Sequence, residues 1–383
     1  MNTMLKLSNT FNQFFDSEKS SGILLVIFTI IAIVITNSPF SQDYLEMWQT
    51  MLGGLTLAHW VNDGLMTIFF LLIGLELERA LYVGELSHFK NALLPITGAI
   101  GGMLIPALIY TLINHGTPTQ AGFGIPMATD IAFALGVIAM LGNRIPSALK
   151  VFLVAFAVID DLGAIVIIAL FYTAKMSLYS LIGALLVWAI LIVLNRIYKI
   201  NHLAPYVIGG VMMWFLMLKS GIHATVAGVM LAFAIPFSLK DDDEKSPSHR
   251  LEHYLHKPVS FIILPVFALA NTGVIFNINS MQSLSSMSSL GVVAGLVIGK
   301  PLGVTILCYF AVKKGICQLP TDVKWPHIFG AGLLGGIGFT MSIFITNLAF
   351  SGNETLINSA KMAILCASFG SGLLGFMWLR FTK

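Results

Sequence analysis

The stretch Ala157-Val-Ile-Asp160-Asp161-Leu-Gly-Ala-Ile165 places two adjacent carboxylates inside an apolar run that extends over residues 147–172. A run of this length predicts a membrane-spanning helix, because about 20 apolar residues cross the hydrocarbon core of a bilayer. One charged side chain at the bilayer centre costs at least about 2.5 kcal/mol. Two such side chains in one span therefore indicate a functional site within the membrane.

Two further charged residues interrupt apolar runs elsewhere in the chain. Asp130 lies within residues 122–141, and Lys300 follows the uncharged stretch 291–299. We expect Lys300 to be the only buried base, with Lys361 on the external side of the membrane. Three acids and one base in otherwise apolar segments indicate a pathway for a cation or for protons.

The composition of the whole chain agrees with a membrane protein. Of its 383 residues, 57% are hydrophobic and 10% are charged, whereas about 25% are charged in soluble proteins. We therefore expect an all-α polytopic membrane protein with a single transporter domain over residues 1–383. Nothing in the charge distribution supports binding to nucleic acid.

Twelve apolar runs are candidates for membrane spans. They cover residues 20–36, 60–78, 92–113, 122–141, 149–172, 178–195, 204–218, 221–237, 258–273, 289–311, 327–350 and 356–379. With the N-terminus inside, most of the 21 lysines and arginines fall on the cytoplasmic side, and only Lys175, Lys219 and Lys361 fall outside. Because basic residues concentrate in cytoplasmic loops, this pattern predicts twelve spans with both termini in the cytoplasm.

Helix-breaking residues lie in two of these runs. The fourth run contains Gly122-Phe-Gly-Ile-Pro-Met-Ala-Thr-Asp130, and the eleventh contains Gly332-Leu-Leu-Gly-Gly-Ile-Gly-Phe-Thr-Met-Ser342. Interrupted segments at corresponding places in two halves are typical of transporters built from inverted repeats. We expect discontinuous helices there, and close packing of small residues is the alternative interpretation.

A discontinuous helix exposes partial charges at its new ends. Asp130 and Lys300 have the opposite signs needed to balance a positive and a negative end. Lys300 either serves this structural purpose, paired with an aspartate, or carries a transported proton. The residues alone leave both roles open.

The two adjacent aspartates are expected to have different neighbours, because successive residues on a helix point about 100° apart. One should face an ion site and the other should meet Lys300. Neighbouring carboxylates in a low dielectric resist simultaneous ionisation, so protons and a small hard cation would compete for Asp160 and Asp161. Thr129 and carbonyl oxygens at the break would complete an oxygen shell.

Two loops have a distinctive composition. Near residues 47–57, two short β-prone runs flank Gly53-Gly54 and predict an external hairpin, which we expect to pair with a second copy of the chain. The cytoplasmic segment near 239–257 is dense in acids, bases and histidines. It is either a solvated connector or part of a pH response.

Four motifs, taken together, closely resemble the NhaA family of sodium/proton antiporters of bacterial inner membranes. They are the segments Ala128–Gly136, Ile159–Gly163, Gly299–Gly303 and Gly338–Phe344. The resemblance extends over essentially the whole chain. It implies an NhaA-like fold of twelve helices, with the fourth and eleventh unwound and crossing in mid-membrane.

The resemblance also implies roles for the buried charges. Asp160 and Asp161 would bind Na⁺ or Li⁺ and protons, while Asp130 and Lys300 would balance the dipoles of the broken helices. Lys300 could also pair with Asp160.

Activation at alkaline pH through a cytoplasmic funnel is a further implication of the resemblance. The matching positions are Glu76, Arg250, Glu252, His253 and His256. His223 resembles a position that tunes the pH dependence, although a hydrogen-bonded core histidine is the simpler interpretation. His249 departs from the family pattern, which has a lysine there. A homodimer is expected from the resemblance of the hairpin to the family's external dimer contact.

These observations predict an electrogenic antiporter that expels Na⁺ or Li⁺ in exchange for inward protons and so serves pH and sodium homeostasis. We expect a multi-pass transporter that is not an enzyme and needs no cofactor. The sequence has no GxxxxGK[ST] motif, which argues against an ATP-driven pump. A sodium/organic-anion symporter would need more basic groups around a larger cavity, and an intramembrane protease would need an HExxH or Gly-x-Gly-Asp setting that the chain lacks.

Overall fold

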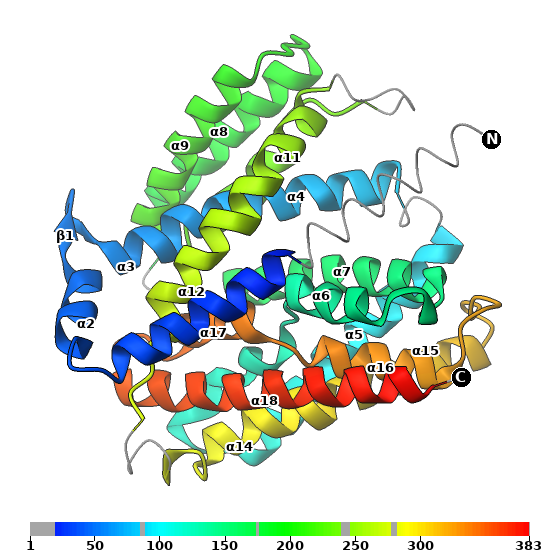
Figure 1. Ribbon diagram of the computed structural model, residues 1–383. Coiled ribbons are helices and arrows are strands. Elements are labelled where there is room, and N and C mark those ends of the chain that lie inside the picture. The colour runs from blue at the N-terminus through cyan, green and yellow to red at the C-terminus, as the bar shows by residue number, and fades with distance from the viewer. Residues whose placement is uncertain (1–19, 85–88, 174–175, 239–245, 277–281, 383) are drawn as a thin grey trace. The chain divides into compact units, whose positions relative to one another are not determined.

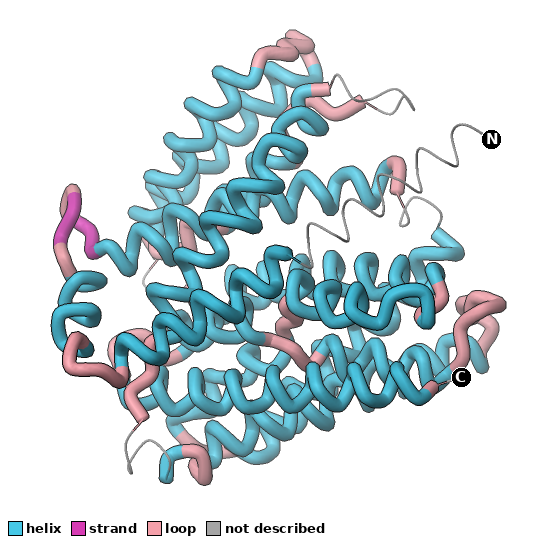
Figure 2. The backbone as a smooth tube through the Cα atoms, viewed as in Figure 1, coloured by secondary structure: helices cyan, strands magenta, loops and turns pink. Residues whose placement is uncertain are grey.

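The computed structural model describes residues 20–84, 89–173, 176–238, 246–276 and 282–382 (Figure 1). Most of this part of the chain is helical, as Figure 2 shows. The strands within it are β1 (Met51–Leu52) and β2 (Leu55–Thr56). The all-α polytopic fold predicted from the sequence is therefore confirmed.

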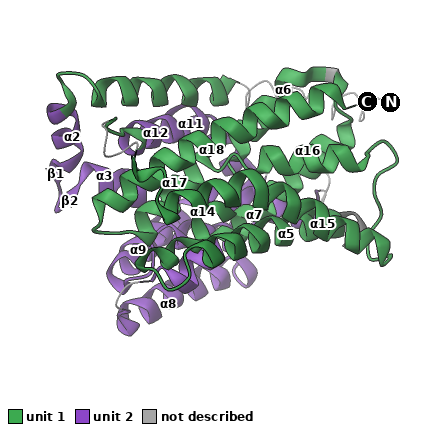
Figure 3. Ribbon diagram, turned by 90° about the horizontal axis from the view of Figure 1, so that it is seen from below, with its two compact units in different colours: residues 1–41, 88–164, 272–383 green, residues 42–87, 165–271 purple. Residues whose placement is uncertain are grey.

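The chain divides into two compact units, each assembled from separate segments (Figure 3). Unit 1 comprises residues 1–41, 88–164 and 272–383, and unit 2 comprises residues 42–87 and 165–271. The expectation of one transporter domain over residues 1–383 stays a prediction.

Unit 1 contains most of the long helices. After the helix Ser20–Thr36, its elements are α5 (Phe89–Ile113), the 3₁₀ segment η2 (Pro118–Met127), α6 (Ile131–Leu141), η3 (Gly142–Arg144), the first part of α7 (Ser147–Phe171), α14 (Met287–Ala294), the π-helical turn η6 (Gly295–Gly299), α15 (Lys300–Lys313), α16 (Trp325–Gly335), α17 (Phe339–Ala349) and α18 (Glu354–Phe381).

Unit 2 contains the hairpin and the remaining helices. Its elements are α2 (Ser41–Gln49), the strands β1 and β2, α3 (Leu57–His59), η1 (Trp60–Leu65), α4 (Met66–Tyr82), the end of α7, α8 (Leu178–Arg196), α9 (Leu203–Ser220), α10 (Val226–Ala232), α11 (Pro247–Pro258), η5 (Val259–Ile263) and α12 (Leu264–Thr272).

Each of the twelve predicted apolar runs coincides with helical structure. Eight helices in the described residues are long and apolar enough to cross a membrane, and ten spans result if each of two bent pairs counts as one. The two remaining runs, 60–78 and 221–237, contain α4 with 17 residues and α10 with 7 residues. Their α-helices are too short to meet the same length criterion, so the count of twelve stays a prediction.

Both predicted helix breaks are present. The fourth run stops at Met127 and restarts at Ile131, and the N-cap residue Asp130 between them is extended, with φ −91° and ψ 101°. The eleventh run stops at Gly335 and restarts at Phe339, with a bend of 48° between α16 and α17. Both breaks lie within unit 1.

The predicted hairpin also forms. β1 and β2 pair in antiparallel register, with Met51 opposite Thr56 and Leu52 opposite Leu55. Gly53 and Gly54 make the turn, and both have positive φ, 61° and 89°. Only glycine adopts such angles without a steric cost, which explains the Gly-Gly pair.

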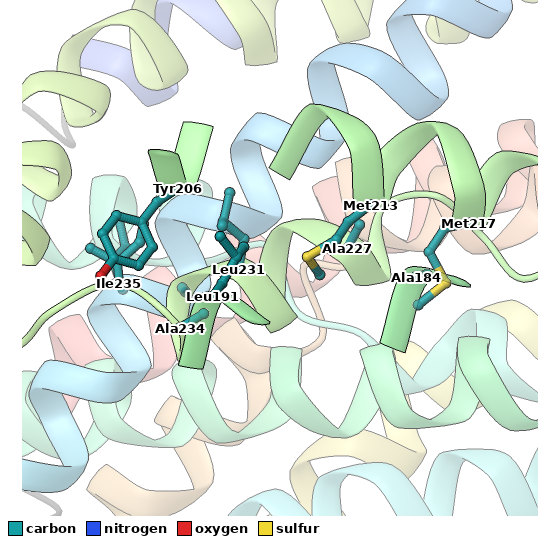
Figure 4. Packing of buried hydrophobic residues seen from close by; sticks show 11 residues of the cluster. Ala184, Leu191, Tyr206, Met213, Met217, Ala227, Leu231, Ala234 and Ile235 are labelled. Atoms are coloured by element: carbon teal, nitrogen blue, oxygen red, sulfur yellow. The ribbon is translucent and has the colours of Figure 1, made fainter. Parts of the chain in front are cut away.

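Unit 2 has an apolar core between α4, α8, α9 and α10. Figure 4 shows side chains of this cluster, including Leu191, Tyr206 and Met213, which are all at most 3% exposed. The indole nitrogen of Trp188 in α8 donates to the Met230 carbonyl of α10 at 2.7 Å. These contacts join the helices on both sides of the turn that carries His223.

Unit 1 is held by a close crossing of α5 and α15. A Cβ atom built on Gly101 would lie 2.1 Å from the Gly303 carbonyl oxygen, and one built on Gly303 would lie 2.1 Å from the Gly101 carbonyl oxygen. The two backbones therefore touch at this point. Such small-residue contacts let membrane helices gain van der Waals packing that larger side chains would prevent.

Gly101→Ala should lower the thermal stability of the protein, because the new methyl group must force α5 and α15 apart. Overpacking of this kind costs about 1–3 kcal/mol. Thermal unfolding of the purified protein in detergent measures the effect. Gly370→Ala in α18 is the matched control, since nothing lies within 4 Å of a Cβ at that position. Equal melting temperatures for the two variants would contradict the assigned contact.

Candidate functional site

Asp130 joins the N-terminal ends of the two half-helices that follow the breaks. Its Oδ1 accepts a hydrogen bond from the backbone N–H of Phe133 in α6 at 3.2 Å. Its Oδ2 accepts from the backbone N–H and from the hydroxyl of Thr340 in α17, at 3.0 and 2.5 Å. One carboxylate thus bonds unpaired N–H groups of two helix N-termini, where negative charge is favoured.

Backbone groups freed by one break bond to the other break. The Asp130 N–H donates to the Ile337 carbonyl at 2.6 Å, and the Thr129 hydroxyl donates to the Gly335 carbonyl at 2.8 Å. The Ser342 hydroxyl donates to the Ile125 carbonyl at 2.7 Å. The two interrupted helices therefore cross in direct contact and satisfy each other's main chains.

Lys300 is completely buried and contacts a helix C-terminus, whereas Asp130 contacts two helix N-termini. Its Nζ donates to the carbonyl oxygen of Met127, the last residue of η2. The same Nζ lies 2.8 Å from Oδ2 of Asp160. A cation at a helix C-terminus offsets the partial negative charge of the last carbonyls. Of the two adjacent aspartates, Asp160 is the one that meets Lys300.

The two aspartates lie side by side on α7, and Asp160 and Asp161 are 0% and 1% exposed. Oδ1 of Asp160 makes no hydrogen bond within the described residues. A buried carboxylate oxygen in this condition is suited to accept a proton or to ligate a small cation. Burial among apolar helices strengthens any electrostatic interaction made there.

The donor set at this place consists of oxygen atoms. In the part of the chain that the structure describes, no group of three or more His, Cys, Asp or Glu side chains is arranged to hold a metal ion. A cation at Asp160 and Asp161 would therefore draw its other ligands from hydroxyl and carbonyl oxygens of the crossing, such as Thr129. Oxygen ligands of this kind suit hard cations and not soft transition metals.

The structure thus brings five of the predicted residues together within unit 1. They are Thr129, Asp130, Asp160, Asp161 and Lys300, contributed by the first break, by α7 and by the start of α15. Sequence reasoning missed Thr340, whose hydroxyl and N–H both bond Asp130. Its place two residues after Gly338 at the second break was the available signal.

The expectation that Lys300 is the only buried base is wrong. Lys361, expected on the external side, is 9% exposed and lies inside α18, within the predicted run 356–379. The helix starts after Asn353, whose side chain accepts from the Leu356 N–H at 3.1 Å, and α14, α16 and α17 pack against it. Lys361 is therefore two turns inside the helix.

The residues predicted for a pH response lie in unit 2. Glu252 in α11 accepts from Arg79 of α4 at 2.9 Å and lies 3.8 Å from His249. Arg250 and His253 are exposed, whereas Glu76 and His256 are half-buried. The predicted residues 239–245 of the cytoplasmic segment lie outside the described residues, and α11 begins at Pro247.

Two further members of this group, Glu78 and Arg79, were missed by the sequence analysis. Glu78, 4% exposed, accepts from the Ser248 hydroxyl at 3.5 Å, and Arg79 forms the ion pair with Glu252. The signal was available, because both follow Glu76 closely on α4. His223 lies in the turn before α10, with Nε2 2.8 Å from the Tyr172 carbonyl oxygen. It is hydrogen-bonded, in agreement with the simpler interpretation.

Comparison with known proteins fits this geometry. The model of a family described as Na⁺/H⁺ antiporter 1 matches residues 12–379. A Na⁺/H⁺ antiporter NhaA of Dechloromonas aromatica is 63% identical over 379 residues, covering 99% of this chain and 97% of that protein. The chain belongs to the NhaA family.

Other NhaA relatives are similar over their full length. The protein named Na⁺/H⁺ antiporter NhaA 1 of Flavobacterium johnsoniae is 55% identical, with 98% of each chain covered. The NhaA antiporter of Vibrio alginolyticus is 48% identical, again with 98% of each chain covered. Membership of this family therefore rests on alignments that include both breaks and the aspartate pair.

A solved structure shares the fold. The sodium proton antiporter MjNhaP1 from Methanocaldococcus jannaschii superposes with a TM-score of 0.56 at 13% sequence identity, covering 99% of this chain and 97% of that one. At this identity the similarity concerns the fold alone. This chain and the archaeal protein therefore share a helical architecture despite very different sequences.

Lys300→Ala should lower the free energy of unfolding, because it leaves the Asp160 carboxylate buried without its cation and the Met127 carbonyl without its donor. Removal of one partner of a buried ion pair costs about 3–5 kcal/mol. Thermal unfolding in detergent gives the measurement. The double variant Asp160→Ala/Lys300→Ala removes both charges and should recover part of the loss. Single effects of Asp160→Ala and Lys300→Ala that simply add up in the double variant, or a still larger loss, would refute the pairing.

Proposed function

We propose that the protein is an electrogenic antiporter that expels Na⁺ or Li⁺ from the cell in exchange for inward protons. The observation that carries this proposal is the buried pair Asp160 and Asp161 beside the crossing of two broken helices, with an oxygen of Asp160 that makes no hydrogen bond within the described residues. The relatives named Na⁺/H⁺ antiporter NhaA support the choice of ions.

Exchange would follow from competition for the same oxygen atoms. The site loses its protons when a Na⁺ ion binds to the carboxylates, and it loses Na⁺ when protons return. Each cycle moves more positive charge inward as protons than leaves as one Na⁺ or Li⁺ ion. At about 2.3 kcal/mol per charge per 100 mV, the membrane potential then drives export of the cation.

The fixed charges around the site would have a supporting role. Asp130 bonds three donors from two helix N-termini, so we assign it to charge compensation and not to ion transport. Lys300 would compensate the carbonyl end of η2 and hold Asp160. Thr129, which bonds the carbonyl of Gly335, would offer its hydroxyl oxygen to the cation.

Activation at alkaline pH is proposed for the polar group of unit 2. His249 lies 3.8 Å from Glu252, which also pairs with Arg79, and His253 and His256 follow on the same helix. Histidine is the side chain whose ordinary pKa, about 6.5, falls in the range where such a switch would act. Glu76, Arg250 and His223 complete the proposed set.

Location and assembly are proposed from the family and the surface. We place the protein in the bacterial inner membrane, with both termini in the cytoplasm, in agreement with the positions of its basic residues. The hairpin strand β1 exposes Met51 and Leu52, 64% and 60% of their surfaces. Exposed apolar side chains on a short edge strand favour pairing with a second copy, so we propose a homodimer.

Asp161→Asn should abolish sodium-dependent proton flux and leave the melting temperature close to that of the wild type. The substitution conserves volume but removes the ionisable oxygen of the site. Inverted membrane vesicles with an imposed potential measure both exchange and its electrogenicity. Asp322→Asn, in an exposed loop, is the matched control. Full sodium-dependent proton flux in Asp161→Asn would contradict the assigned site. A wild-type flux that does not change with the imposed membrane potential would contradict electrogenic exchange.

Replacing His253 and His256 together by Gln should shift the pH profile of exchange without lowering its maximal rate. The two histidines are proposed to report cytoplasmic pH and not to bind the transported ion. Exchange rates in inverted vesicles between pH 6 and pH 9, chosen to bracket the ordinary histidine pKa of about 6.5, give the profile. His115→Gln, in an exposed loop, is the control. An unchanged profile would mean that pH dependence arises from simple competition at Asp160 and Asp161.

A further inference from the structure

Unit 1 contains an apolar cavity that the exchange mechanism does not use. Its volume is about 520 Å³, which falls within the usual range for ligand sites of about 300–1,000 Å³. Three helices and the second break form its walls. The helices contribute Val26 and Ile30 from the helix Ser20–Thr36, Val137 and Met140 from α6, and Leu373 and Phe376 from α18.

The lining of the cavity fits a hydrocarbon chain. Its two hydroxyl groups already have partners, since Thr29 donates to the Leu25 carbonyl at 2.7 Å and Ser368 accepts from the Phe339 N–H at 3.1 Å. A polar ligand would therefore lose hydrogen bonds to water without replacing them. Ile30 and Met140 are 54% and 64% exposed, so the cavity opens at the protein surface between helices that cross the membrane.

Positive charge lies at one end of the cavity. The guanidinium carbon of Arg380 is 6.0 Å from the centre of the Phe376 ring, and Arg144 is exposed one turn beyond Met140. The C-terminal end of α6 and the chain's C-terminus lie at the same end of unit 1 in Figures 1 and 3. The lining segments, residues 20–36, 131–150 and 365–382, contain no Asp or Glu.

We infer that this cavity binds one acyl chain of an anionic phospholipid, with the lipid phosphate at Arg144 and Arg380. Apolar walls in a bilayer favour an acyl chain, and the two arginines select a negatively charged headgroup. A zwitterionic lipid offers the same chain without the net charge. The inference thus assigns a lipid site in addition to the ion site.

The cavity shares its walls with the helix crossing. Phe133, whose N–H bonds Asp130, packs edge to face on Phe339 at 4.8 Å between ring centres. Both rings line the cavity, together with Ile337, whose carbonyl accepts the Asp130 N–H. A bound chain therefore packs against three residues of the crossing, and its loss should loosen unit 1.

The test uses the full-length protein, purified and delipidated in detergent. Dioleoyl phosphatidylglycerol or dioleoyl phosphatidylcholine is added, and bound lipid is counted by native mass spectrometry while melting temperature is followed. We expect several-fold more retained phosphatidylglycerol than phosphatidylcholine, with a higher melting temperature only for the anionic lipid. Equal retention of the two lipids would overturn the inference.

Two kinds of variant locate the site. Val137→Phe fills the cavity and should abolish both the retention and the thermal gain. Gly372→Leu fills the cavity from α18, where a Cβ makes only an ordinary contact of 3.4 Å with Ile337. This second variant tests lipid retention at the cavity if Val137→Phe does not fold. Full retention in the folded cavity-filling variants would exclude this site.

Removal of the charges tests the headgroup contact. The double variant Arg144→Gln/Arg380→Gln should retain the two lipids equally. Lys313→Gln is the matched control, because its Nζ lies 6.0 Å from the ring centre of Tyr309 but Tyr309 does not line the cavity. A loss of selectivity in Lys313→Gln as large as in the double variant would indicate a general surface charge effect and refute the assigned site.

Discussion

The hydrogen bonds between the two helix breaks are the interaction on which the rest of unit 1 depends. A break inside a membrane span frees N–H and carbonyl groups that have no water to bond, and each unpaired group costs several kcal/mol. Here the groups of one break bond those of the other, from Asp130 N–H to the Ile337 carbonyl and from Thr129 to the Gly335 carbonyl. Each interrupted helix is therefore tolerable only in the presence of its counterpart.

The charges of the site follow from this crossing. Two helix N-termini meet at one point, and the Asp130 carboxylate bonds donors from both. The carbonyl end of η2 meets the Lys300 ammonium instead, which also bonds Asp160. Compensation of the helix ends thus engages Asp130 and Lys300, and of the two carboxylates on α7 it is Asp160 that bonds the ammonium group. Two adjacent aspartates thus have different surroundings even though one turn of helix contains both.

Much of this arrangement was predictable from local sequence. Gly and Pro near Asp130 predicted the first break, the glycines of residues 332–338 predicted the second, and Gly53-Gly54 predicted the hairpin. The features that local sequence could not predict are those that depend on contacts between residues far apart in the chain. The burial of Lys361 depends on the helices that pack against α18, and the pairing of Glu252 with Arg79 joins residues that lie 173 positions apart. A single sequence has no local pattern that records such distances.

Residues 337–340 of the crossing contact Asp130 on one side and line the apolar cavity on the other. Residues 337–340 present the Ile337 carbonyl and Thr340 to Asp130, while the side chains of Ile337 and Phe339 line the apolar cavity. A backbone segment of four residues cannot shift on one side without moving on the other, because packed interiors transmit displacement. Any movement of the broken helices that changes access to Asp160 and Asp161 must therefore also reshape the cavity. An occupant of that cavity would bind the two states of the crossing with different affinity, and such a difference is the requirement for a ligand to shift a conformational equilibrium.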